Sequence, residues 1–287
     1  MPTTKQTIES SPQYLTLSSF TNFISNGPTT CSELTSAINP ATPTDTISTY
    51  LETLWNALLL LASQTEWSSL THQKLVNLLQ SIQSEPSTET DELPEYNGTK
   101  FSWSKLPDLS IYIRDWYNFS PPFSTSSSSQ SPLNGLNFGT DEWLNLNAFL
   151  ATLTKSSLAE KTSDVESTPT DYSLYAIWAL RTLEVDPGTL DQVDLADVQT
   201  AAVWIVIARK ELHILCKQER KYEGNLARAG DAFRDREWKG FNMDRWAVWE
   251  TAFERLLSLE SEKEDGEIRV IRLVRQAGIV MRMAGNE

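Results

Sequence analysis

The chain of 287 residues is 40% hydrophobic and contains ten tryptophans, a composition typical of a folded protein and not of a disordered one. Its formal net charge is −14, with 8 basic and 23 acidic residues up to position 208 and 16 basic and 15 acidic residues after it. An acidic surface repels phosphate backbones, so the composition argues against nucleic-acid binding.

The apolar runs and the cysteines indicate the cellular location to be expected. The longest apolar runs, at 57–62 and 201–208, are far shorter than the ~20 residues that a membrane-spanning helix needs. The N-terminus has no apolar core of the kind found in signal peptides. Cys31 and Cys216 match no metal-binding or redox spacing. We therefore expect an intracellular, cytoplasmic protein with free thiols and no membrane contact.

The first half of the chain is predicted to alternate between helices and polar segments. After a frayed tail at 1–12, apolar residues recur at steps of three and four, which is the spacing of one helix face. Helices are predicted over residues 14–25, 44–66, 69–83, 106–119 and 140–155. Polar or low-complexity composition predicts loops over residues 84–100, 120–138 and 156–170.

Residues 171–287 are predicted to form a compact C-terminal helical core. Helices are expected over residues 171–184, 194–220, 242–257 and 265–283, with residues 218–240 crossing the surface in a partly helical form. Residues Asp171 and Asp194 are suited to cap the first two of these helices. No period repeats along the chain. The sequence therefore predicts an all-α fold, an irregular multi-helix bundle with long polar loops, as one domain over 1–287.

The segment GFNMDRWAVWETAFERLL, residues 240–257, combines helix signals with large aromatic residues. Asn242 can accept a hydrogen bond from an orphan backbone N–H as the N-cap. Trp246, Trp249 and Phe253 follow at steps of three and four, so they lie on one helix face. Such an apolar stripe usually faces a protein core. We interpret it as a buried helix face, with a functional aromatic wall as the competing hypothesis.

The same segment resembles a fungal family known as domain of unknown function 3632. The resemblance lies in Gly-Phe at 240–241, Arg-Trp at 245–246, and the later tryptophan and phenylalanine at helical spacing. Residues 172–184, 198–212 and 275–285 also fit. The resemblance covers about the last 120 residues. It implies an all-helical fold and a fungal source, and it implies no activity.

Motifs that carry known chemistry are not found. The sequence has no glycine-rich phosphate loop, nucleophile elbow or kinase motif set. Three aspartates at 191, 194 and 197 could hold a divalent cation, but they fall at a helix start, where capping explains them. The acidic stretch 91–95 is similar to a cyclase metal motif, but Pro94 interrupts it. We therefore predict no metal and no cofactor.

One helix face carries His213 and Cys216 three residues apart. A zinc site needs three or four such ligands, and the chain offers only His72 and Cys31 besides. We therefore interpret His213 and Cys216 as packing residues.

Arginines inside apolar helices suggest two further hypotheses. Arg181, Arg209 and Arg245 need carboxylate partners if they are buried, and Glu184, Glu211 and Asp244 are available. They either form structural ion pairs or line an anion-binding pocket walled by tryptophans. The candidate pocket consists of Trp178, Arg181, Trp204, Arg209, Arg245, Trp246 and Trp249.

Two functions follow from these patterns. The first hypothesis is a non-enzymatic interaction or scaffold protein with a protein partner, because catalytic motifs are missing and the polar loops suit partner contacts. The alternative is a small-molecule binding protein or cofactor-free enzyme that takes a small apolar or anionic molecule in the candidate pocket. Acid–base work would then fall to Asp244 or Glu250 beside Trp246. The balance leans against an enzyme.

Overall fold

A computed structural model describes residues 3–22, 27–85, 94–119, 131–159, 169–259 and 268–284. These residues are helical apart from connecting segments and one antiparallel hairpin, β1 (Glu95–Tyr96) and β2 (Thr99–Lys100). The all-α class is therefore confirmed. Internal contacts divide the chain into two compact units, Met1–Phe149 and Leu150–Glu287. That both units belong to the single domain expected from the sequence stays a prediction.

The first unit is built around α4, the long helix predicted at 44–66. Its apolar positions, including Leu51 and Leu54, are buried, and the Trp55 indole N–H donates to the Pro107 carbonyl over 2.7 Å. The helices of this unit are α1 (Lys5–Glu9), α2 (Pro12–Asn22), α3 (Gly27–Thr35), α4 (Thr44–Gln64), α5 (Thr71–Gln83), η1 (Trp103–Lys105), α6 (Leu109–Tyr117) and the start of α7 (Thr140–Ala159). Each helix predicted in this half therefore has a counterpart, and α1, α3 and η1 are additions.

Three details of the predicted segments are wrong or incomplete. Residues 1–12 are not a frayed tail in their described part, because Ile8 of α1 is buried and Thr4 caps that helix. Residues 94–100 form the hairpin inside the predicted loop 84–100. Helix α7 continues to Ala159, into the predicted loop 156–170. Residues 131–138 contain no helix or strand, as expected. The rest of these loops, including 91–93 of the acidic stretch, lies outside the described residues.

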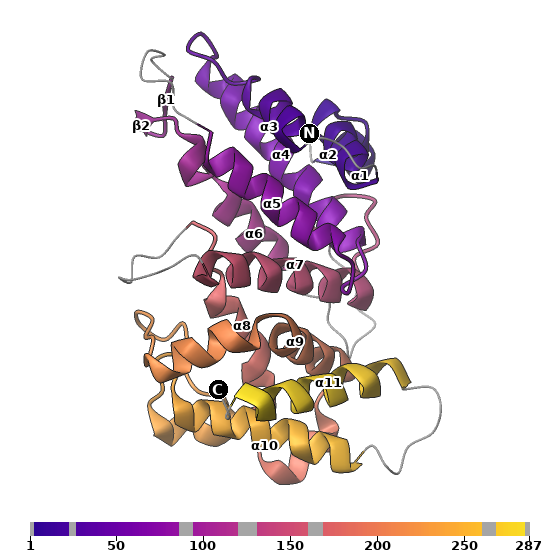
Figure 1. Ribbon diagram of the computed structural model, residues 1–287, viewed down its shortest axis with the longest axis vertical. Coiled ribbons are helices and arrows are strands. Elements are labelled where there is room, and N and C mark those ends of the chain that lie inside the picture. The colour runs from indigo at the N-terminus through magenta and orange to yellow at the C-terminus, as the bar shows by residue number, and fades with distance from the viewer. Residues whose placement is uncertain are drawn as a thin grey trace. The chain divides into compact units, whose positions relative to one another are not determined.

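The second unit packs its helices around buried tryptophans. Its further elements are α8 (Ser173–Leu180), η2 (Arg181–Leu183), η3 (Pro187–Gln192), α9 (Leu195–Lys217), η4 (Asp231–Arg236), α10 (Met243–Leu259) and α11 (Ile268–Ala284). Helix α11 lies against both α9 and α10 (Figure 1). Trp204 of α9, Trp249 and Phe253 of α10, and Val274 and Met281 of α11 have no exposed side-chain surface. These side chains form the core on which the site described below is built.

Two observations bear on the cellular setting. No helix within the described ranges combines the length and the apolar character that crossing a membrane requires. Cys31 and Cys216 are both buried, and neither forms a disulfide.

A buried histidine makes the first unit sensitive to acid. His72 of α5 is 2% exposed and packs near the Phe149 ring, with 6.2 Å between the ring centroids. Burial lowers the pKa of His72 to about 4, against weaker opposing effects of the Thr65 and Glu66 backbone and the Glu66 charge. In the unfolded chain the imidazole takes up its proton near pH 6.5. Above pH 6.5 His72 is neutral in both states and costs the fold no stability. As the pH falls from 6.5 towards 4, only the unfolded chain takes up the proton, so the free energy of unfolding decreases.

We predict that His72→Leu removes this pH dependence. Between pH 7 and pH 5, protonation of His72 should cost the wild-type protein about 2 kcal/mol of unfolding free energy. Urea unfolding of both proteins at the two pH values measures the effect, and contributions of carboxylates shared by both proteins cancel in the difference. An equal loss of stability in wild type and variant would contradict the assignment.

Candidate functional site

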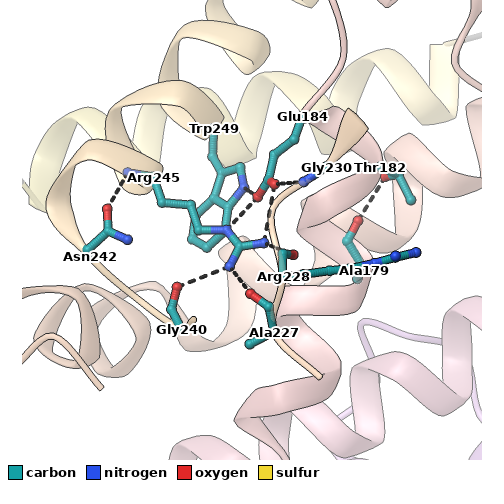
Figure 2. Close-up of polar contacts among 10 residues, drawn as sticks. All are labelled: Ala179, Thr182, Glu184, Ala227, Arg228, Gly230, Gly240, Asn242, Arg245 and Trp249. Atoms are coloured by element: carbon teal, nitrogen blue, oxygen red, sulfur yellow. Dashed lines mark hydrogen bonds and ion pairs between the residues drawn. The ribbon is translucent and has the colours of Figure 1, made fainter. Parts of the chain in front are cut away.

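The centre of the second unit is a buried arginine with every donor engaged. Arg245 of α10 is fully buried, and its Nε and Nη2 donate to the two carboxylate oxygens of Glu184, over 2.6 and 3.2 Å. Its remaining N–H groups donate to backbone carbonyls: Nη1 to Ala227 and Gly240, over 2.8 and 3.0 Å, and Nη2 to Arg228 over 3.0 Å (Figure 2). A guanidinium has five N–H donors, so Arg245 has none left for a ligand.

Both carboxylate oxygens of Glu184 likewise accept hydrogen bonds from donors within the protein. Oε1 accepts from Arg245 and from the Trp249 indole N–H, which lies 2.8 Å away. Oε2 accepts from Arg245 and from the backbone N–H of Gly230 at 2.6 Å. The guanidinium carbon also lies 5.5 Å from the ring centroids of Trp238 and Trp249, within the range of cation–π attraction. A buried pair with such complete hydrogen bonding offsets the cost of removing two charges from water.

The structure distributes the seven predicted pocket residues over the second unit. Arg245, Trp246 and Trp249 lie together on α10, where all three are buried. Trp204 is buried on α9. The remaining three are half-buried: Trp178 of α8 donates to the Leu226 carbonyl, Arg209 of α9 donates to the Val280 carbonyl of α11, and Arg181 lies in η2. The buried helix face predicted at 240–257 is confirmed, as is the Asn242 cap, which accepts from the Arg245 backbone N–H.

Residues 221–240 form a loop whose conformation is set by this network, and we call it the clamped loop. Its ends are joined at an isolated bridge between Lys221 and Gly240, and the Tyr222 N–H donates to the Lys239 carbonyl over 2.8 Å. Arg245 holds it from within through three carbonyls, two from its middle and one from its end. A Cβ at Gly230 would lie 2.5 Å from the Cβ of Glu184, so only glycine fits there. Long loops within compact domains are usually either functional or disordered, and this one is held in one conformation by the hydrogen bonds above.

The clamped loop lines an open surface cavity of about 450 Å³, which we call the hollow. It is lined by Gly224, Asn225, Arg228, Ala229, Arg234, Glu237, Trp238 and Lys239. None of the seven predicted pocket residues is among them. Three of the lining residues are cationic and one is anionic. Trp238 is only 8% exposed and stacks on Phe233 at an interplanar angle of 17°. The lining of the hollow therefore combines a mostly buried indole with three cations and one carboxylate.

The other residues considered for chemistry have structural surroundings. Asp194 caps α9 by accepting from the Ala196 N–H, as expected. His213 packs on Trp246, with 4.8 Å between ring centroids. Burial raises the pKa of the Cys216 thiol to about 12. Burial, followed by the charge of Glu254, raises the pKa of Glu250. Within the described ranges, no three or more His, Cys, Asp or Glu side chains are grouped so that they could hold a metal ion.

Sequence reasoning missed the hollow and part of the network's construction. Residues 218–240 were expected to be partly helical, and η4 is the helical part, but the folded loop around it was not predicted. The available signal was three glycines, at 224, 230 and 240, in a stretch otherwise rich in charge. Glycines recur where backbones approach closely or turn sharply. They indicate a tightly folded loop, a detail that the prediction of a partly helical surface segment did not contain.

Comparison with known proteins identifies a family that the chain matches. A family model described as "Protein of unknown function (DUF3632)" matches residues 55–253. The match includes residues 240–253 but ends before 275–285, which the resemblance had included, and it extends further into the first half than the resemblance did. No curated protein and no solved structure matches the chain.

Proposed function

This chain belongs to the DUF3632 family of proteins of unknown function, and we propose that it is a non-enzymatic interaction or scaffold protein that contacts a protein partner through the clamped loop. One observation carries the proposal. A fully buried ion pair, Arg245 with Glu184, is used to hold an irregular surface loop in one conformation. Loops fixed by a rigid scaffold are common positions for binding residues.

The chemistry of the core supports binding over catalysis. All donors of Arg245 and both oxygens of Glu184 are engaged within the protein. These groups are therefore suited to positioning the loop and not to proton transfer. Fixing the loop before binding lowers the entropy cost of forming an interface. A cytoplasmic, intracellular location is part of the proposal, supported by two cysteines that are buried and unbonded.

Site-specific photo-crosslinking tests the proposal in cells that naturally express the protein. A benzophenone amino acid replaces Ala232, an exposed residue of the clamped loop, or Thr251, an exposed residue of α10 used as the matched control. We expect one discrete crosslinked partner from position 232 and none from position 251. The same partner, once purified, should bind the purified chain. Failure of both positions to crosslink, or the same products from both, would count against the loop.

A second candidate is a small-molecule binding protein. The hollow, at about 450 Å³, lies within the size range of small-molecule sites, and it is lined by tryptophan and arginine as the alternative hypothesis required. Its lining residues are largely exposed, however, whereas that hypothesis called for a closed apolar pocket. A thermal-shift screen of anionic metabolites against the wild type and Arg228→Ala separates the candidates. A ligand that stabilises only the wild type would favour this second function.

A further inference from the structure

Two cations of the hollow have no direct polar partner among the described residues, although the hydrogen bond from Arg234 and, more weakly, the charge of Arg228 lower the pKa of Asp231. The side chains of Arg228 and Lys239 are exposed, and within the described ranges neither forms an ion pair or a hydrogen bond. Arg234 differs, because Asp231 accepts from its Nε and Nη2 over 3.0 and 2.6 Å. Glu237 is the one carboxylate in the lining. The hollow thus presents two positive charges without a direct ion-pair partner beside a third that is already paired.

Hydrogen bonds within the clamped loop fix the backbone positions of these two cationic residues. Arg245 Nη2 holds the Arg228 carbonyl at 3.0 Å, and the Lys239 carbonyl accepts from the Tyr222 N–H at 2.8 Å. The backbone of both cationic residues is therefore placed in advance, while their side chains remain available. Little backbone ordering is left to be lost when an anion binds between them.

We propose that the hollow binds the phosphate of a phosphorylated side chain on a protein partner; this rests on the proposed interaction function. A phosphomonoester carries a charge of about −1.5 to −2 near pH 7 and offers three acceptor oxygens. It therefore matches two cations without a direct ion-pair partner, whereas a single carboxylate carries one charge. An arginine can bind phosphate oxygens through two parallel N–H donors, and Arg228 is the residue placed to do so.

The shape of the hollow favours a side chain of a larger partner over a free small molecule. Six of its eight lining residues are exposed, and the two buried ones are Ala229 and Trp238. Sites for small molecules bury most of the ligand surface, which this open lining does not do for a molecule that enters alone. A long polyanion is also disfavoured, since the chain carries a net charge of −14. A phosphorylated side chain belongs to a partner that can bury further surface around the hollow. Its negative charge is confined to one group, so it meets less repulsion from the acidic chain than a long polyanion would.

The test uses fluorescein-labelled peptides with degenerate flanks and the purified full chain, measured by fluorescence anisotropy. The central residue is phosphoserine, phosphothreonine or phosphotyrosine, and matched peptides carry the unphosphorylated residue or aspartate. We expect at least one phosphorylated set to bind at least tenfold more tightly than its matched sets. Its affinity should rise from pH 5.0 to pH 7.5, because the second phosphate pKa is about 6. None of the lining residues is a histidine, and the charges facing the phosphate are Arg228, Arg234, Lys239, Glu237 and Asp231.

Variants locate the binding. Arg228→Ala and Lys239→Ala should each weaken the phosphopeptide about tenfold, the effect of losing one charge-assisted hydrogen bond. Lys217→Ala, which removes an exposed lysine on α9 that is not among the lining residues, is the control and should not change the affinity. Circular dichroism checks that each variant is folded.

Several results would overturn the inference. They are equal affinity for aspartate peptides, affinity that does not change with pH, equally tight binding of inorganic phosphate or phenyl phosphate, or no binding of any phosphorylated set. If position 232 still crosslinks to a partner while these peptides fail, the interaction function stands and the phosphate assignment fails. If neither experiment succeeds, both fail.

Discussion

Replacing Arg245 with alanine is expected to lower the unfolding free energy of the protein by about 3–5 kcal/mol, the usual cost of removing one partner of a buried ion pair. The change leaves the Glu184 charge buried and without its cation. It also leaves the carbonyls of Ala227, Arg228 and Gly240 without their donor. Since domains are stable by only about 5–15 kcal/mol, the variant should be largely unfolded at moderate urea concentrations. Urea unfolding followed by circular dichroism measures the loss.

A double-mutant cycle separates the ion pair from simple loss of packing. Glu184→Gln should also be strongly destabilising, because it leaves the Arg245 charge buried. Arg245→Met alone should likewise be strongly destabilising, because it leaves the Glu184 charge buried. The variant that combines Arg245→Met with Glu184→Gln should be more stable than the sum of these two single changes predicts, since neither buried charge is then left unpaired. Arg234→Ala is the matched control, because its pair with Asp231 is largely exposed, and we expect it to unfold with the wild type.

The cycle also decides between the two hypotheses drawn from the sequence. If Arg245 served a ligand and not the core, removing it would leave the fold as stable or more stable, because functional groups are often a burden on stability. If the Arg245→Ala variant unfolded at the same urea concentration as the wild type, the structural assignment would therefore be refuted. The hydrogen bonds to the carbonyls of Ala227 and Gly240 argue against that outcome, since both carbonyls would be left unsatisfied in a buried position.

The partner of Arg245 could be narrowed from sequence, but not its other contacts. Glu184 was one of three carboxylates that could be named as a partner for a buried arginine, because it lies at the end of an apolar helix, where a charged side chain can be close to the core. Asn242 and Asp194 could be named as caps, because capping needs only a local pattern. The carbonyls that Arg245 binds could not be foreseen. Every residue offers a carbonyl, so no residue type marks the ones that a distant side chain will meet.

Burial of the tryptophans shows the same limit. Helical spacing correctly placed Trp246 and Trp249 on a buried face. The same reasoning on α8 does not give the surroundings of Trp178, which is half-buried and donates to Leu226 of the clamped loop. Helical periodicity indicates which face of a helix is buried. It does not indicate which segment covers that face, because the covering segment is distant in the sequence. Short helices were missed for a related reason, since α1 buries a single residue, Ile8.

The second large effect is expected for Gly240→Ala at the end of the clamped loop. A Cβ at this position would lie 1.9 Å from the carbonyl oxygen of Arg220 and 2.9 Å from the Cα of Lys221. Both are backbone atoms, so no side-chain rotation relieves the clash. The strands of chain at the loop base must separate, which breaks the hydrogen bond from the Phe241 N–H to the Arg220 carbonyl. Overpacking and lost hydrogen bonds together should cost about 3 kcal/mol or more.

Gly224→Ala provides the matched control within the same loop. Gly224 adopts φ +58°, but a Cβ there would meet no atom within 4 Å. That change should cost only the strain of a left-handed conformation, about 1 kcal/mol. Thermal unfolding should therefore place Gly240→Ala well below Gly224→Ala, by roughly 5 °C or more for a chain of this size. Because Gly240 also supplies a carbonyl to Arg245, protease cleavage within residues 221–239 should become faster in Gly240→Ala alone. Equal melting temperatures for the two variants would mean that the loop base does not need this close approach.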